Sequence, residues 1–374
     1  MASKQSSSQE PRAEVPTLRQ IGQIVGVSPS TVSAVLNNAP RARVYSRSTV
    51  ERIRAAAEEL GYFPNALAST LKRAKSGLIG AVVFSQQRLY HVPKLQAATE
   101  RAREVGYELI AGDTTYKTVE IERCLQMLGG WRVEGLLLMT GGHPIEQSII
   151  IILENTGTPY VQVGVRQPDS PCSGAVYDNF LAGRLLAKHL TALGHVKIGV
   201  LGGNPENPES AEWLRGIVSV LEESGVRLED RCVIDRPGTG LELSAGYRFA
   251  GELLEREPNV TAIVCENDVL AIGAMRRVRE CGREVPADIS ITGVGDICPA
   301  VAGEENRFCN YVSPGLTTIR TPLEEMGKAA VNMLVEMIRD EGDTKPQAIL
   351  ELSSRLIVRE STAPPKASQI RPSS

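Results

Sequence analysis

The chain has few of the features that mark membrane, secreted or metal-binding proteins. Its longest uninterrupted apolar run, Ile149–Leu153, cannot cross a bilayer, which takes about 20 apolar residues. The 7 cysteines contain no C-x-x-C pair, which argues against a disulfide framework and against the usual zinc motifs. The 4 histidines show no H-E-x-x-H or similar spacing, so we expect neither a metal ion nor another cofactor.

Enzyme signatures are missing as well. The sequence contains no G-x-S-x-G nucleophile elbow, no G-x-x-x-x-G-K-[ST] phosphate loop and no glycine fingerprint that opens a helix after a strand. We therefore do not expect an enzyme. Residues 1–16 are rich in Ser and Gln without the apolar centre of an export signal, and we expect a disordered tail on a cytoplasmic protein.

The chain does have the size and composition of a globular protein with more than one domain. Its 374 residues exceed what one compact core usually holds, and 42% of them are hydrophobic. The net charge of −3 conceals an asymmetry, because residues 1–76 carry 11 Lys and Arg against 5 Asp and Glu, whereas the remainder carries 30 against 39. A basic front piece on an acidic body indicates that only the front piece meets a polyanion.

Residues 17–37, TLRQIGQIVGVSPSTVSAVLN, predict two short helices joined by a tight turn. Apolar residues recur at helical spacing in both halves, so each helix has one face to bury against the other. Gly26 can end the first helix in the left-handed conformation, Val27 can fill the turn and Ser28 can cap the second helix. This pattern predicts a helix-turn-helix motif, although a small helical hairpin with an ordinary polar surface would share it.

The second helix of such a motif enters the major groove of DNA, where short polar side chains hold phosphates and base edges. The residues of the motif that we expect to contact DNA are Thr17, Leu18, Ser28, Pro29, Ser30, Thr31, Ser33, Ala34 and Asn37. The loop Asn38–Tyr45 adds Arg41 and Arg43, which alone mean little but beside such a helix become candidate phosphate contacts.

A third helix is expected to begin at a capping box formed by Ser48 and Glu51 and to stop at Gly61. In the following segment, Asn65 can cap a very short helix that would be unstable alone. Two such helices in a dimer could fold on DNA and insert Leu71 into the minor groove as a wedge. The residues of this segment that we expect to bind DNA are Asn65, Ala68, Leu71 and Lys72, unless the segment is only a basic linker.

The rest of the chain alternates between strand-like and helical stretches, which indicates parallel β-α-β units. Strands are predicted at Leu78–Val83, Tyr107–Ala111, Gly135–Met139 and Tyr160–Val163, then at Lys197–Leu201, Cys232–Asp235, Ala262–Cys265 and Ile289–Gly293. Helices are predicted at Lys94–Val105, Val119–Leu128 and Pro144–Glu154, then at Asn179–Leu193, Glu209–Ser224, Leu241–Glu255 and Asp268–Glu280. Two doubly wound lobes result, with a ligand cleft outside the strand ends.

These features together resemble one known family. The stretches TLRQIG–VGVSPSTVSAVLN, ELGYFPNALASTL and SGLIGAVV are similar to the headpiece, hinge and first core strand of the lactose-repressor (LacI/GalR) family of bacterial transcriptional regulators. Later stretches agree, among them LAKHLTALGHVKIGVLGG, TAIVCENDVLAIGAMRRVRECGREVPADISITGVGD, LTTIRTPLEEMGKAAVNML and SSRLIVRESTAP. The resemblance spans residues 17–361 and implies a core like that of a periplasmic sugar-binding protein, whose last 50 or so residues cross back between the lobes.

The resemblance also implies positions that contact a small-molecule effector. Asn267, Asp296 and Asp178 stand at such positions, although Asp and Asn also commonly cap the helix that follows. Trp213 replaces an Arg of sugar-responsive members, and Phe84, Tyr90 and His91 add aromatic surface on the first lobe. A less polar pocket follows, which favours a carbohydrate-related or aromatic effector, a sugar conjugate or no effector at all.

A further departure from the family concerns DNA. The family's usual V-S-R is Val32-Ser33-Ala34 here, so a side chain that often contacts the operator is missing. The loop after it is longer by about three residues in comparison with the family, with Arg41 and Arg43 as possible substitutes. This predicts an altered operator half-site rather than lost binding.

The sequence thus predicts an α/β protein with a small all-α helix-turn-helix headpiece and a two-lobed core. Its expected parts are a tail at 1–16, the headpiece at 17–64, a hinge at 65–76, the core at 77–362 and a second disordered tail at 363–374. We expect a homodimeric regulator, more often a repressor than an activator, that binds double-stranded operator DNA and a small-molecule effector and needs no membrane. A solute-binding protein or a nucleotide-sugar enzyme on a similar fold are the alternatives.

Overall fold

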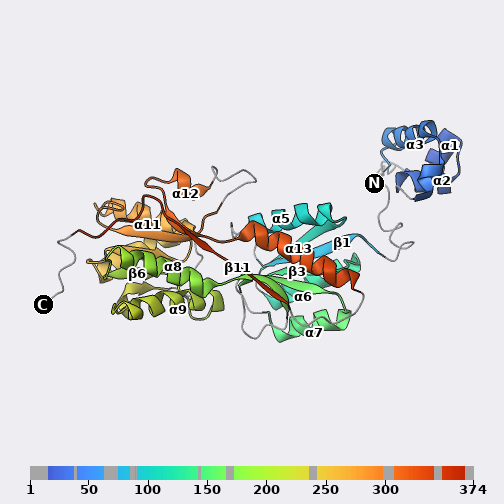
Figure 1. Cartoon of the computed structure of the whole chain (residues 1–374). Helices are drawn as coiled ribbons and strands as arrows, with labels where there is room; N and C mark the ends of the chain where they lie inside the picture. The colour runs from blue at the N-terminus through green and yellow to red at the C-terminus, as the bar shows by residue number, and fades with distance from the viewer. Residues whose placement is uncertain are drawn as a thin grey trace, which may run out of the picture. The chain divides into compact units, whose positions relative to one another are not determined.

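A computed structural model gives the architecture of most of the chain (Figure 1). It describes residues 16–37, 40–62, 75–84, 89, 91–115, 117–141, 145–165, 172–235, 242–297, 307–340 and 348–366. The chain divides into two compact units, Met1–Ser76 and Gly77–Ser374. This division falls where the sequence places the end of the hinge, and each unit is considered separately.

The first unit contains a three-helix headpiece, visible as the blue helices of Figure 1. Its elements are α1 (Leu18–Val25), α2 (Pro29–Leu36), the short 3-10 helix η1 (Pro40–Val44) and α3 (Arg47–Glu59). A small core of its own holds the unit together, with Ile21, Val32, Val35 and Ile53 at its centre. The helix-turn-helix expected from the apolar spacing is therefore present.

The turn between α1 and α2 is built as the sequence predicts. Gly26 has φ 77° and ends α1 in the left-handed conformation, while the Ser28 hydroxyl accepts from the Thr31 backbone N–H at 3.2 Å. A Cβ on Gly22 would lie 2.6 Å from the carbonyl oxygen of Val27. Only glycine at this position lets the turn close tightly against α1.

Two local predictions for the headpiece are wrong. The segment expected to be an irregular loop contains the 3-10 helix η1, whose Ala42 turns inward and packs against the headpiece core. The cap of α3 is Ser46 rather than Ser48, because the Ser46 hydroxyl accepts from the Thr49 backbone N–H at 3.2 Å. Glu51 pairs with Arg47 at 3.0 Å instead of closing a capping box.

The second unit begins with a lobe built on a six-stranded sheet in the order β11-β5-β4-β3-β1-β2, in which the strands are parallel. The strands are β1 (Leu78–Phe84), β2 (Glu108–Thr114), β3 (Leu136–Met139), β4 (Tyr160–Val165), β5 (Ser173–Tyr177) and β11 (Ile349–Leu352). Helices α5 (His91–Glu104) and α13 (Leu323–Arg339) share one apolar cluster with the sheet, and α6 (Thr118–Gly130) and α7 (Gln147–Thr156) share another.

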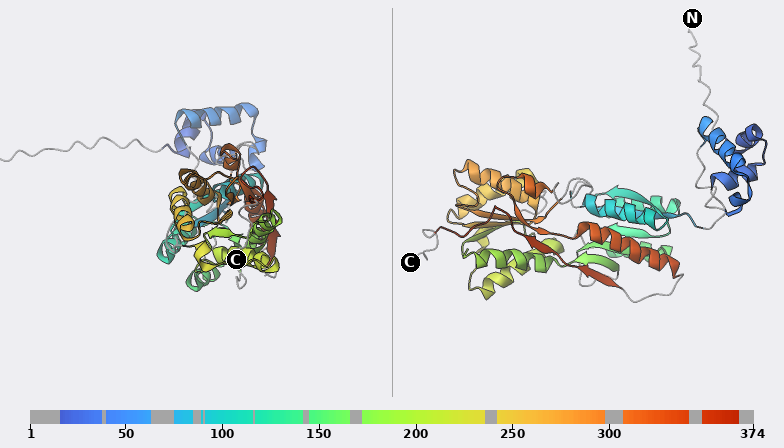
Figure 2. Two further views of the ribbon diagram at one scale, coloured as in Figure 1. Left: turned by 90° about the vertical axis from the view of Figure 1, so that its left-hand side faces the viewer. Right: turned by 45° about the horizontal axis from the view of Figure 1, so that its top comes forward.

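Strand β1 shows why both faces of this sheet are covered. Its residues alternate between the two clusters, with Ile79 and Val83 packed in the cluster of α5 and α13 and Val82 packed in that of α6 and α7. A parallel sheet buried on both faces needs such apolar strands. The lobe is a three-layer sandwich, as Figure 2 shows from two further directions.

The second lobe repeats this plan. Its sheet has the order β12-β10-β9-β8-β6-β7, in which only β12 runs antiparallel to its neighbour. The strands are β6 (Ile198–Leu201), β7 (Val233–Ile234), β8 (Ala262–Cys265), β9 (Ser290–Gly295), β10 (Thr317–Arg320) and β12 (Arg355–Ile357). Helices α8 (Asn179–Ala192) and α9 (Pro208–Glu223) cover one face, and α10 (Leu243–Arg256) and α11 (Asp268–Glu280) cover the other. Two short pieces, η2 (Asp230–Cys232) and α12 (Phe308–Tyr311), complete the lobe.

The chain passes between the two lobes three times. It leaves the first sheet after β5, returns from β10 to α13, and crosses again from β11 to β12. The sequence predicted this return of the last segment only through its resemblance to a family. Each sheet has the order 2-1-3-4-5 among its first five strands. After the second strand, the connections run toward the opposite edge of the sheet. This reversal point lies between β1 and β3 in the first sheet and between β6 and β8 in the second.

The predicted elements of the core are present, with small shifts in their ends. Helix α7 begins at Gln147 rather than near Pro144, and strand β5 was not expected from the sequence. The prediction that a disordered tail starts at residue 363 is wrong, because the described chain continues to Lys366. The Ala363 N–H donates to Ser290 Oγ at 3.0 Å, and the Lys366 ammonium donates to Asp288. Among the described residues, each helix is too short or too polar to cross a membrane.

Candidate nucleic-acid interface and ligand site

The N-terminal end of α2 presents the polar surface that the sequence predicts. Ser28, Pro29 and Ser30 are exposed, whereas Thr31 and Ser33 are half-buried. Thr17 is exposed and caps α1 through a reciprocal bond with Gln20, and Leu18 is half-buried beside the headpiece core. Short hydroxyl side chains at the start of an exposed helix can approach a DNA backbone or base edge closely.

Two residues of the predicted DNA face have structural roles instead. Ala34 is 2% exposed, so its methyl group cannot reach a base, and the prediction that it contacts DNA is wrong. The segment expected to be a loop, η1, also packs against α2. Asn37 ends α2, where its side-chain amide donates to the Ser33 carbonyl at 2.8 Å.

The two arginines of η1 lie beside this face. Arg41 and Arg43 are both exposed, and the Arg41 Nη2 donates to the backbone carbonyl of Ser30 at 3.1 Å. The guanidinium of Arg41 is thereby held at the N-terminal turn of α2. Asn65, Ala68, Leu71 and Lys72, the predicted hinge contacts, lie outside the described residues.

In the second unit, two of the predicted effector residues stand at the ends of strands and cap helices. Asp178 follows β5 and accepts from the Leu181 N–H at 2.9 Å, and Asn267 follows β8 and accepts from the Leu270 N–H at 2.8 Å. Both side chains are half-buried. The capping role, which the sequence left open beside the ligand role, is therefore the one that the geometry demonstrates.

Glu266 organises the strand ends around Asn267. Its carboxylate accepts from the Gly203 N–H at 2.8 Å and from the Ser210 hydroxyl. These bonds connect β8, the loop after β6 and the first turn of α9 at the reversal point of the second sheet. A small molecule that binds an open α/β sheet does so at such a point. No sequence motif marks Glu266 as functional, although it directly precedes Asn267.

Three predicted effector residues offer almost no surface to a ligand. Phe84 is 2% exposed, His91 1% and Trp213 1%, and their rings are buried within the lobes. Trp213 packs with α8, α9 and the second sheet, and its indole N–H has no partner among the described residues. The expectation of an aromatic pocket surface is therefore wrong for these three side chains, and Tyr90 lies outside the described residues.

Asp296 is wholly buried, and both of its carboxylate oxygens are engaged. Arg359 Nη2 donates to Oδ1 at 2.8 Å, and Arg320 Nε donates to Oδ2 at 2.6 Å. The Arg307 Nε lies 3.7 Å from Asp296 Oδ2, and the Arg307 Nη1 donates to the backbone carbonyl of Asp296. Because a buried carboxylate needs such partners, Asp296 connects the ends of β9 and β10 to the segment after β12 instead of facing a ligand. A spacing pattern could not have revealed these three arginines.

A second buried carboxylate, Asp268, begins α11. It is 2% exposed and accepts from the Thr318 hydroxyl at 2.5 Å and from the Ile297 N–H at 3.3 Å. Burial raises the pKa of this carboxyl to about 6, and the nearby charge of Asp296 adds to that rise while the hydrogen bonds oppose it. Gly293 passes so close to Asp268 that a Cβ there would lie 2.5 Å from Oδ1.

A hydrogen bond of Tyr177 joins the two lobes directly. The Tyr177 hydroxyl at the end of β5 donates to Glu209 in the first turn of α9 at 2.6 Å. The Asn179 amide, also at this passage, donates to the Glu209 carbonyl at 2.6 Å. The sequence does not predict this contact, because its partners are far apart in the chain.

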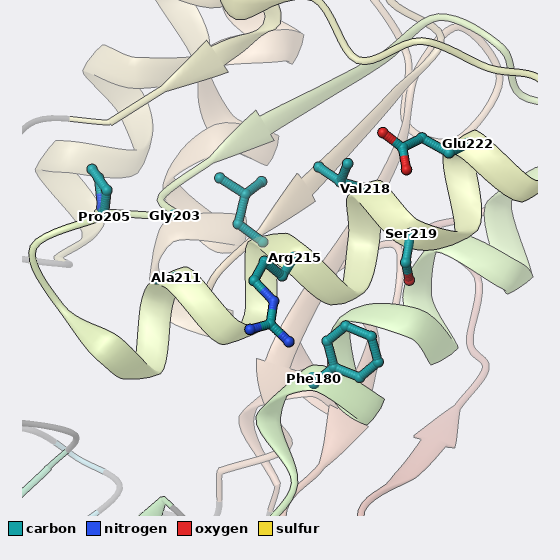
Figure 3. A pocket seen from close by; sticks show the side chains of 9 residues that line it. Phe180, Gly203, Pro205, Ala211, Arg215, Val218, Ser219 and Glu222 are labelled. Carbon is teal, nitrogen blue, oxygen red and sulfur yellow. The ribbon is translucent and has the colours of Figure 1, made fainter. Parts of the chain in front are cut away.

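A shallow pocket of about 460 Å³ lies on the outer side of α9 (Figure 3). It is lined by Phe180, Gly203, Pro205, Ala211, Leu214, Arg215, Val218, Ser219 and Glu222. The Phe180 ring lies 5.4 Å from the Arg215 guanidinium and 5.9 Å from that of Arg184. Because none of the predicted effector residues lines it, this pocket is separate from the expected ligand site.

The headpiece and the two-lobed core define a DNA-binding transcriptional regulator with a ligand-binding type of core. The model of bacterial regulatory proteins of the lacI family matches residues 17–65, and that of the periplasmic binding protein-like domain matches residues 187–362. A relative named HTH-type transcriptional repressor PurR, from Photobacterium profundum, is 30% identical and covers 92% of this chain and 98% of its own length. The repressor of the same name from Escherichia coli is 31% identical over 93% of this chain and 97% of its own length.

Solved structures agree with the sequence relatives. The lac repressor dimer bound to operator and the anti-inducer ONPF has a TM-score of 0.77 and 25% identity, covering 94% of this chain and all of the other. A complex of the transcriptional regulator CelR with cellobiose has a TM-score of 0.66 and 26% identity, covering 92% and 99%. The protein belongs to the lacI family of bacterial regulatory proteins, which confirms the resemblance, the fold class and the regulatory function predicted from the sequence.

Proposed function

We propose that the protein is a homodimeric repressor that binds a near-palindromic operator and is released or recruited by a small effector. The observation that carries this proposal is the exposed polar N-terminal turn of α2, Ser28–Ser30, on a separately folded headpiece. In such a motif this turn contacts base edges, and two headpieces on a symmetric dimer contact two half-sites. The dimeric lac repressor on its operator supports the proposal by similarity. Because its partner would be bacterial chromosomal DNA, we place the protein in the cytoplasm, at the nucleoid.

The hinge contributes to DNA binding in this proposal. Asn65, Ala68, Leu71 and Lys72 would form a short segment that orders on DNA, with Leu71 inserted between base steps in the minor groove. The basic residues of the first 76 positions would supply the attraction to phosphate. Replacing Leu71 with Ala should then reduce both the operator affinity and the bend angle of the DNA.

The effector would bind between the lobes at the carboxyl ends of the strands. We propose Asn267 and Asp178 as its contacts, since both are half-buried and hold polar atoms at strand ends. An amide can both donate to and accept from a ligand, and a carboxylate accepts from hydroxyl or amino groups. The absence of an Arg at position 213, where Trp213 is buried, favours an effector less polar than a simple sugar.

The central experiment selects operator DNA from a random library with the full-length protein. We expect a near-palindromic consensus, a dimer by analytical ultracentrifugation at micromolar concentration, and binding that weakens steeply as salt rises. A protein that stays monomeric and prefers no oligonucleotide over bulk competitor DNA would contradict the proposal.

The effector is sought by thermal-shift screening of a metabolite library. A compound that stabilises the core should also change operator affinity, and operator should change the affinity for that compound by the same factor, because coupling is reciprocal. The variant Asn267→Ala should lower the affinity for the compound, and its operator affinity in the absence of the compound should stay close to that of the wild type. Ser219→Ala in the separate pocket is the matched control. If only Ser219→Ala lowers the affinity for the compound, the effector binds elsewhere.

A further inference from the structure

The 3-10 helix η1 has features that a connecting loop does not need. It packs on α2 and turns Ala42 inward against the headpiece core. Arg41, Arg43 and Val44 face solvent, and Val44 is 84% exposed. An apolar side chain with so much exposed surface, beside exposed arginines, indicates a contact surface rather than a spacer.

The geometry of η1 places Arg41 and Val44 on one face. A 3-10 helix has three residues per turn, so side chains at positions i and i+3 lie one above the other. Arg43 lies on a different face of the same short helix and is also exposed. The helix therefore presents one arginine with a valine on one side and a second arginine on another.

Arg41 is fixed in place by its bond to α2. Its Nη2 donates to the Ser30 carbonyl at 3.1 Å, in the turn that the proposed function directs toward base edges. A guanidinium has five N–H groups, so four remain after this bond. A planar guanidinium held in one orientation suits paired bonds to guanine O6 and N7, whereas a phosphate needs only a positive charge.

We infer that η1 is a second base-contacting element, in which Arg41 recognises a guanine and Val44 contacts the methyl group of a neighbouring thymine. Arg43 contacts the phosphate backbone. The segment thus supplies the specificity that the buried Ala34 cannot supply from α2. The inference rests on the proposed function and adds the base classes read at one position of each half-site.

The test starts from the operator that the full-length wild type selects from random DNA. Fluorescence anisotropy then measures affinity for every single-base change in the half-site. For the wild type we expect one guanine whose replacement weakens binding by about 10- to 100-fold. For Arg41→Lys, which keeps the charge and loses the planar pair of donors, discrimination at that guanine should decrease while the preferences at other positions remain.

Arg43→Ala provides the comparison. It should weaken binding to all sequences by a similar factor and reduce the slope of log affinity against log salt by about 1 for each headpiece. Val44 is tested by replacing the neighbouring thymine with uracil, which lacks the methyl group. This change should weaken operator binding by the wild type. It should have no further effect on operator binding by Val44→Ala, whose affinity for the operator with thymine is already reduced.

The outcomes separate this inference from the function on which it rests. The wild type could select a consensus while Arg41→Lys and Arg43→Ala both weaken binding to all sequences by a similar factor. In that case both arginines contact phosphate, so the inference is wrong but the proposed regulatory function is still supported. If the wild type selects no consensus, the proposed function itself fails. Circular dichroism shows whether Arg41→Lys keeps its helices, so that a loss of discrimination is not a loss of fold.

Discussion

Asp296 shows how burial decides what a carboxylate does. Its position after β9 is one at which the family resemblance implies an effector contact, yet its side chain is 0% exposed and bound by arginines. Arg320 precedes the passage to α13, and Arg359 follows β12. The carboxylate therefore connects the ends of β9 and β10 to the segment that follows β12 within the second lobe. Removing one partner of such a buried group leaves the others uncompensated, which is costly.

The neighbouring Asp268 should make stability depend on pH. Its pKa of about 6 in the fold lies above the value of 3.8 expected when the chain is unfolded, so between these values the folded state binds more protons. The contribution of Asp268 to the free energy of unfolding is therefore fully present below pH 3.8. It falls as pH rises to about 6, by about 3 kcal/mol in total.

The measurement compares urea unfolding of the wild type and Asp268→Asn from pH 4 to pH 7. Because other groups titrate alike in both proteins, the wild type should lose stability relative to Asp268→Asn as pH rises, and the difference should level off above about pH 6. A difference that does not vary with pH would show that Asp268 titrates normally.

The start of α3 offers a second test at the scale of single residues. Ser46→Ala should cost about 1 kcal/mol, because it leaves the Thr49 N–H without its side-chain acceptor. Ser48 lies two residues later, at the second position of α3, and Ser48→Ala should cost less than about 0.5 kcal/mol. Hydrogen exchange at the Thr49 amide reports on both variants, and equal acceleration in the two would contradict the assignment of Ser46 as the cap.

The sequence could predict that a helix starts here but could not choose between these two serines. Ser48 and Glu51 fit the capping-box spacing, whereas the structure pairs Glu51 with Arg47. The same limit applies to Trp213, since a sequence position gives no information on whether a ring lines a pocket or fills the space beneath a helix pair. Side-chain orientation depends on contacts that are distant in the chain.

Helix packing in the second lobe depends on close approaches between glycines and backbone. A Cβ on Gly216 of α9 would lie 2.1 Å from the Phe180 carbonyl, and one on Gly183 of α8 would lie 2.1 Å from the Trp213 carbonyl. The two helices therefore cross where each offers a glycine to the other. The pair α10 and α11 repeats this arrangement through Gly246 and Gly273. No side chain larger than hydrogen fits at these crossings without moving a helix.

The variant Gly216→Ala should destabilise the second lobe by at least about 1–3 kcal/mol, because the helix must shift to admit the methyl group. Gly129→Ala is the matched control, since a Cβ there meets nothing within 4 Å in a helix and should stabilise the protein by roughly 0.5–1 kcal/mol. Urea unfolding followed by tryptophan fluorescence in a Trp131→Phe background, in which Trp213 is the single tryptophan, measures the second lobe directly. An equal effect of both variants would show that the crossing can relax.

Elements with strong periodic or apolar patterns were predictable from the sequence, and short or connecting ones were not. The apolar runs of β1 and β8 and the amphipathic repeats of α9 and α10 specify their own structure. Strand β5, with the sequence SGAVY, depends on pairing with β4 and β11. Helix η1 forms on the surface of α2, so its existence is a tertiary effect.

At the scale of the whole molecule, the two units have separate cores and should respond differently to DNA. Operator at 1,000 times its dissociation constant stabilises the headpiece that binds it by about 4.1 kcal/mol, whereas the core gains no more than the coupling free energy of about 1–3 kcal/mol. When operator binds, amide hydrogen exchange at the buried headpiece residue Ile53 should therefore slow more than amide hydrogen exchange at Ile263 in the core. A scrambled duplex is the control, and equal slowing at both positions would indicate one cooperative unit.

The route of the chain through the lobes has a consequence for biosynthesis. The first lobe receives helix α13 and strand β11 only after the entire second sheet except β12 has been made, and Met326, Val331 and Leu334 of α13 fill its centre. A ribosome that has translated 300 residues has thus released a finished headpiece but an open lobe with its apolar interior uncovered. Premature termination should therefore yield fragments that chaperones and proteases remove, instead of truncated regulators that occupy operators without any means of release.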